Sequence, residues 1–96
     1  MEKIEITTPE PAKARLVLQD AIERHRRLLT QSVVRTHERV KQLASQLQVD
    51  PDRLSAGEVP HPEGQDMNLI ELEGELEILR HLREQVETLE RLTLCP

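Results

Sequence analysis

The sequence contains no phenylalanine, tyrosine or tryptophan among its 96 residues. A hydrophobic core can therefore be built only from leucine, isoleucine, valine, alanine and methionine. Such a core is thin, since a single core in a chain below about 80 residues supplies only about 3–5 kcal/mol, and this chain is little longer. Association is the usual remedy for a small chain. We therefore expect one domain, residues 1–96, that forms a homodimer or a higher homo-oligomer.

Cysteine is almost lacking, and long apolar runs are lacking altogether. The single Cys95 excludes an intramolecular disulfide and is typical of a reducing compartment, and we interpret it as an exposed free thiol. The sequence has neither a signal-peptide pattern nor the run of about 20 apolar residues that crosses a bilayer. These features predict a cytoplasmic protein without a membrane segment.

The formal net charge of −5 is unevenly distributed along the chain. Residues 10–49 contain eight lysines and arginines against four acids, whereas residues 50–96 contain four arginines against twelve acids. We expect the basic first half to lie beside the acidic second half, in exposed pairs that each contribute about 0–1 kcal/mol. The densest basic cluster, residues 23–27, lacks the aromatic residues and the helix-turn-helix pattern of nucleic-acid-binding proteins. We therefore do not expect this chain to bind nucleic acid by itself.

Residues 66–93 are predicted to form a helix with apolar residues on two opposite sides. A helix advances by about 100° per residue, which gathers Leu69, Leu72, Leu76 and Leu79 on one side and Met67, Ile70, Gly74 and Ile78 on the other. A helix on the surface of a globular protein carries only one such stripe. The pattern therefore predicts two buried sides, of which the first packs within the chain and the second meets a partner.

Gly74 in the middle of this helix costs about 1 kcal/mol relative to alanine. We interpret it as a place where another backbone comes close, and the alternative is that it is tolerated at an exposed position.

Residues 9–48 are predicted to form a long helix with a single apolar stripe. The stripe comprises Leu18, Ala21, Ile22, Leu28, Leu29, Val33, Val40, Leu43, Ala44 and Leu47. His25 and Thr36 are its polar exceptions, and we predict that they lie in the core and fix the register of the packing, as single polar residues do in coiled coils. The alternative for His25 is a ligand or proton-transfer group.

The remaining segments connect or precede the two helices. Residues 49–65 are predicted to be a connector with a short helical turn, which Asp50 caps and Gly57 ends. Residues 1–8 alternate polar and apolar side chains around Ile4 and Ile6. They are predicted to pair as a strand with a second copy, to add to the sheet of a partner, or to remain an arm.

No catalytic, cofactor-binding or metal-binding residues are predicted. Carboxylate metal sites in helical bundles use the pattern Glu-x-x-His, but the residue three positions before His81 is Ile78. The serines have no histidine and aspartate in a recognisable arrangement with them. We therefore expect a protein that is not an enzyme.

Residues 12–29, AKARLVLQDAIERHRRLL, and residues 69–89, LIELEGELEILRHLREQVETL, resemble short helical prokaryotic proteins of the antitoxin-like type. The resemblance implies a small acidic cytoplasmic protein that neutralises a toxin-like protein by occluding it, without chemistry. It implies no particular functional residue.

The predicted fold is all-α, an antiparallel hairpin of residues 9–48 and 66–93 that dimerises into a four-helix bundle. The predicted function is that of a non-enzymatic protein-binding module, antitoxin-like or regulatory. The alternatives are a self-assembling structural bundle and a small mutase-type enzyme that would bind an anionic substrate through Arg24 or Arg27. The predicted interface residues are Met67, Ile70, Gly74, Ile78, Leu82, Leu18, Ile22, Leu29 and Val33.

Overall fold

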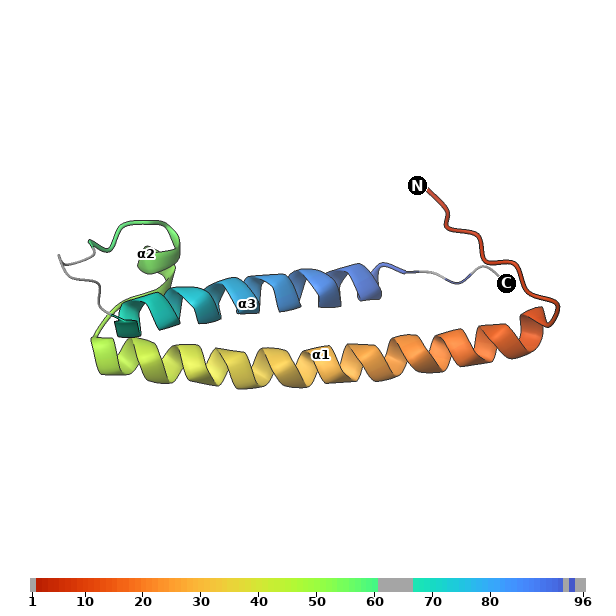
Figure 1. Cartoon of the computed structure of the whole chain (residues 1–96), viewed down its shortest axis with the longest axis horizontal. Coiled ribbons are helices and arrows are strands. Elements are labelled where there is room, and N and C mark those ends of the chain that lie inside the picture. The colour runs from red at the N-terminus through yellow and green to blue at the C-terminus, as the bar shows by residue number, and fades with distance from the viewer. Residues whose placement is uncertain (1, 61–66, 93, 95–96) are drawn as a thin grey trace.

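The computed structural model describes residues 2–60, 67–92 and 94, which form an extended helical hairpin (Figure 1). Its helices are α1 (Pro11–Leu47), α2 (Pro51–Ser55) and α3 (Met67–Glu90). α3 returns along α1, so that the end of α3 lies toward the first half of α1 (Figure 1). The predicted all-α hairpin is confirmed. No strand occurs in the part of the chain that the structure describes.

α1 begins and ends where local backbone chemistry dictates. The prediction placed its start at residue 9, but it begins at Pro11. A residue that precedes proline avoids the helical region, and Glu10 accordingly has φ −131° and ψ 71°. At the other end, Gln48 adopts a left-handed conformation with φ 55°. The Val49 N–H then donates to the carbonyl oxygen of Ala44 at 3.0 Å, which closes the last turn.

The short helix α2 closes the loop end of the hairpin. Asp50 caps it as predicted, since its Oδ1 accepts a hydrogen bond from the Asp52 N–H at 2.9 Å. Gly57 follows it with φ 75°, a conformation that glycine adopts without strain. Leu54 of α2 is buried and belongs to the hydrophobic core. The predicted helical turn is therefore confirmed, and it covers the end of the core.

The core is a single cluster of aliphatic side chains between α1 and α3. Leu72 is its centre and is fully buried, with an exposed fraction of 0%. Its buried members are Val40, Ala44, Leu54, Leu69, Leu72 and Leu79, with Leu76 packed against them. The leucine row of α3 therefore faces α1, as predicted.

α1 is much longer than the helix that covers it. At 1.5 Å per residue, its 37 residues span about 55 Å, whereas the 24 residues of α3 span about 36 Å. Glu90 at the end of α3 lines the same surface depression as Thr30 and Val33. Residues 11–24 of α1, here termed the overhang, therefore extend beyond α3 (Figure 1). The chain after α3 reaches the overhang at Arg15, whose Nη1 lies 3.5 Å from the carbonyl oxygen of Leu94.

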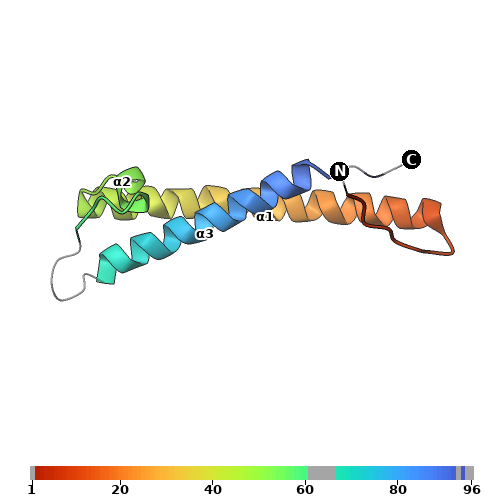
Figure 2. The same ribbon diagram turned by 90° about the horizontal axis from the view of Figure 1, so that it is seen from above.

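The prediction of one clean buried stripe along α1 was wrong in part. Leu28 has an exposed fraction of 60%, and Ala21 is also exposed, while Leu18 and Ile22 are half-buried. One neighbouring helix covers only a narrow arc of α1, and Leu28 and Ala21 lie roughly 100° around the helix from the line of Val40. α3 also crosses α1 obliquely (Figure 2), so its line of contact shifts along the helix.

Residues 2–10 form an arm with no secondary structure, in which Ile4 and Ile6 are exposed. Pairing as a strand with a second copy or with the sheet of a partner stays a prediction. A strand needs a neighbour to satisfy its backbone groups, and no described segment of this chain supplies one.

The core position of Leu72 gives a direct test of this fold. Leu72→Ala should lower the free energy of unfolding by about 2–5 kcal/mol, because it removes a fully buried side chain and leaves a cavity. Urea denaturation followed by circular dichroism at 222 nm measures the change. Ile78→Ala, on the exposed side of the same helix, is the matched control, and it should cost far less in dilute solution. Equal losses in both variants would contradict the packing.

Candidate protein-binding face

The second apolar row of α3 is exposed along its whole length. Met67, Ile70 and Ile78 have exposed fractions of 69%, 42% and 50%. A methyl group built on Gly74 would meet no atom within 4 Å. The row points away from α1 because its residues lie on the side of α3 roughly opposite the buried Leu72. The chain itself therefore covers the leucine row and leaves this row open.

An ion pair identifies the edge of α1 that lies on the same side as this row. Arg39 of α1 places its Nη2 3.3 Å from Glu71 Oε1 and 3.2 Å from Glu75 Oε1. Ile78 follows Glu71 by seven residues, about two turns, so it lies on the same side of α3. One side of the hairpin therefore carries both the Arg39 bridge and the open row of α3.

Two exposed residues of α1 extend this surface, Leu28 beside the end of α3 and Val17 in the overhang. Leu28 and Val17 precede Arg39 by 11 and 22 residues, which is close to three and six full turns, so all three lie along one line. Both apolar side chains are exposed. We define the open face as Met67, Ile70, Gly74 and Ile78 of α3 with Val17 and Leu28 of α1.

Sequence reasoning missed Val17 and placed Leu28 in the core. The 11-residue spacing between them was the available signal.

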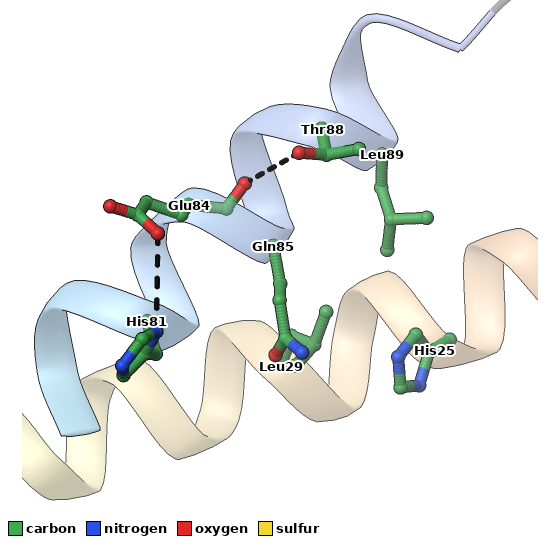
Figure 3. Close-up of a pocket in the computed structure, with 7 residues that line it drawn as sticks. All are labelled: His25, Leu29, His81, Glu84, Gln85, Thr88 and Leu89. Carbon is green, nitrogen blue, oxygen red and sulfur yellow. Dashed lines mark hydrogen bonds and ion pairs between the residues drawn. The ribbon is translucent and has the colours of Figure 1, made fainter.

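A shallow groove of about 360 Å³ continues the open face between the helices (Figure 3). Its residues are His25 and Leu29 of α1 and His81, Glu84, Gln85, Thr88 and Leu89 of α3. Gln85 and Leu29 lie between the two histidines in Figure 3, which keeps the imidazoles apart. His81 Nδ1 lies 3.9 Å from Glu84 Oε2 instead, and the Thr88 hydroxyl donates to the Glu84 carbonyl oxygen at 2.9 Å. The groove has leucines in its wall and polar groups around them, without convergent catalytic groups.

The two predicted polar core residues have different positions. Thr36 is buried between the helices as predicted. His25 is exposed at the groove of the single chain, and its place in the core of a dimer stays a prediction. It lies about 60° around α1 from the line of Val40, at a level where α3 is near its end.

The other predicted interface residues are partly used by the hairpin itself. Leu29 is buried within the chain and is therefore not available to a partner. Val33 is half-buried and packs against the core. Leu18, Ile22 and Leu82 are also half-buried. Of the predicted set, the residues exposed to a partner are Met67, Ile70, Gly74 and Ile78.

The basic cluster of α1 pairs with acids of its own helix. Arg26 Nη2 lies 2.7 Å from Glu23 Oε1, and Arg24 Nε lies 3.0 Å from Asp20 Oδ2. The hydrogen bond from Arg26 lowers the pKa of Glu23, despite an opposing effect of desolvation. The expectation that the basic half pairs with the acidic half is met by Arg39. From this cluster only a longer-range attraction between Arg26 and Glu90 of α3 reaches the acidic half. The helices are antiparallel, so the cluster lies far from the acids at the start of α3.

Glu77 beside the open row is held ionised by its neighbours. Arg80 donates a hydrogen bond to it, and His81 Nε2 lies 3.1 Å from its Oε1. The Arg80 hydrogen bond is the main reason that the pKa of Glu77 is lowered. The margin of the open row therefore stays negatively charged at neutral pH.

Within the described residues, no group of three or more histidine, cysteine, aspartate or glutamate side chains is placed to hold a metal ion. In the same part of the chain, no helix has the length and apolar character to cross a membrane. Comparison of the chain with family models, curated proteins and solved structures finds no match. The functional proposal therefore rests on the geometry of the open face.

The contact between Arg80 and Glu77 predicts a specific titration. Arg80→Gln should raise the pKa of Glu77 toward its ordinary value, because the donor that stabilises the carboxylate is removed. Since the folded pKa is lowered, the stabilisation is present above the unfolded pKa and is lost as pH falls through the folded pKa. Carbon-detected NMR of the glutamate carboxyls measures the change. Arg83→Gln on the same helix is the control, and an unchanged Glu77 titration in Arg80→Gln would contradict the contact.

Proposed function

We propose that the protein is a non-enzymatic binding module, whose open face docks on a helix of another polypeptide and occludes that partner. The observation that carries the proposal is the exposed row of Met67, Ile70 and Ile78 on a hairpin that has already buried its other apolar row. Binding through this face requires no cofactor and no chemistry by the chain.

The surface area of the chain supports a binding role. The chain exposes 8048 Å², whereas a compact monomer of its 11.1 kDa would expose about 5,700 Å². The radius of gyration is 19.0 Å, against about 12–13 Å for a compact domain of this length. The difference in area exceeds the roughly 800 Å² that each partner contributes to a standard interface. The excess exposed area of the hairpin is therefore large enough for an interface of standard size.

The shape of the open row favours a helical partner. Residues 67, 70, 74 and 78 are spaced by three, four and four, which is the spacing of a ridge on a helix. Gly74 in the middle of the row lowers the ridge there and would allow another helix to approach closely. A convex ridge of this kind fits beside a second helix and does not enclose a small molecule.

The resemblance of residues 12–29 and 69–89 to antitoxin-like helical proteins suggests what such binding would achieve. A helix of the partner that binds along the open face would have its own apolar side covered by this chain. If that side is the working surface of a toxin-like protein, binding alone would neutralise it.

Site-specific cross-linking tests the proposed function. A photoreactive p-benzoylphenylalanine introduced at position 70 should cross-link to one protein species in the source cells. The matched control is position 34, since Val34 is also an exposed apolar residue but lies about 120–140° around α1 from Leu28 and Arg39. Equal cross-linking from both positions, or none from position 70, would contradict the proposal.

The affinity of the purified partner then measures the contribution of the row. Ile78→Glu should raise the dissociation constant at least about tenfold, since it places a charge in an apolar contact. Val34→Glu should leave it unchanged. Isothermal titration calorimetry gives both values, and circular dichroism checks that both variants keep the helix content of the parent chain.

A further inference from the structure

The overhang has no helix packed on it, and part of its surface is uncovered although Leu94 contacts it at Arg15. It extends about 20 Å beyond α3, and it exposes Leu16 and Val17. The open row from Met67 to Ile78 is about 17 Å long by the same measure. The uncovered length of α1 and the uncovered row of α3 are therefore similar in length, and they lie at opposite ends of the hairpin.

These two ends also carry opposite charges. Residues 11–29 of α1 contain five lysines and arginines against two acids, a net charge of +3. Residues 67–78 of α3 contain four glutamates and no basic residue, a net charge of −4. Within one chain the two segments lie at opposite ends of the hairpin, because α1 and α3 are antiparallel. Only another molecule can bring such segments together.

From these observations we propose that the open face is occupied by a second copy of this chain, turned end for end. A two-fold axis perpendicular to the long axis of the hairpin would lay the overhang of each copy along α3 of the other. Two equivalent contacts would form at once, one at each end, as in an isologous dimer. The inference rests on the proposed function, because it uses the same open face, and it assigns that face to a second copy of this chain in place of a different protein.

The spacing of apolar residues gives this dimer a register. In this arrangement the overhang of one copy runs parallel to α3 of the other. Val17 and Leu28 are 11 residues apart, and so are Met67 and Ile78. If Val17 lies beside Met67 of the second copy, Leu28 then lies beside Ile78.

The same register places Gly74 of one copy beside Arg24 of the other. The absence of a side chain at position 74 then makes room for the long stem of the arginine, which can cover apolar surface while its charge stays in water. In this register Gly74 has a packing role in the dimer, although glycine destabilises the helix that contains it.

The mass in solution tests whether a second copy binds. Light scattering coupled to size-exclusion chromatography should give twice 11.1 kDa for the parent chain. Ile70→Glu should shift the protein to the monomer mass at the same concentration, with a dissociation constant raised at least about tenfold. Val34→Glu is the matched control and should remain dimeric. A parent chain that is monomeric at all concentrations up to several hundred micromolar would overturn the proposal.

The orientation is tested by cross-linking introduced cysteines in a Cys95→Ser background. A Val17→Cys chain mixed with a Met67→Cys chain should form a mixed dimer with a short bismaleimide. Neither variant should cross-link efficiently with itself, because equivalent residues lie at opposite ends of the dimer. Self-linking of each variant without mixed dimers would show that the loop ends lie together and would overturn the end-for-end arrangement.

The two proposals fail in different ways. A monomeric parent chain that still cross-links from position 70 to a different protein would overturn the second copy as partner and support the proposed function. A monomer without any cross-link from position 70 would overturn both.

Discussion

The packing of the leucine row of α3 against Val40 and Ala44 of α1 is the contact on which the rest of the structure depends. Without aromatic residues, it is a thin seam of aliphatic side chains two helices wide. Leu72 is fully buried in it, and Leu54 of α2 closes its end. A seam of this width can bury only one side of each helix, so the second row of α3 remains exposed and the overhang of α1 has no helix packed on it.

Much of this architecture could be predicted from the sequence because it depends on local rules. The leucine row, the Asp50 cap and the turn at Gly57 follow from spacing and backbone chemistry. The covered part of α1 could not be predicted, since it depends on where α3 ends and how it crosses. Leu28 was therefore placed in the core. The partner of Arg39 likewise depended on the antiparallel register, which no local pattern encodes.

The candidate site was predictable to a similar degree. The second row of α3 follows from helical periodicity, and it is exposed because no described helix packs on that side of α3. The contribution of α1 required the structure, because the Arg39 bridge identifies which edge of α1 lies beside Glu71. The length of the overhang, the charges of residues 11–29 and 67–78, and the 11-residue spacing of the apolar residues all fit one arrangement of two copies. A short covering helix, a basic segment at residues 11–29 and an acidic segment at residues 67–78 are features that one antiparallel dimer would satisfy together.

The central claim is that another copy of the chain covers the surface that this hairpin leaves open. Amide hydrogen exchange of the overhang, measured over a range of protein concentrations, tests it most directly. The overhang has no covering helix of its own, so its protection should rise with concentration as a second copy binds. Protection that is equally low at every concentration would contradict the account.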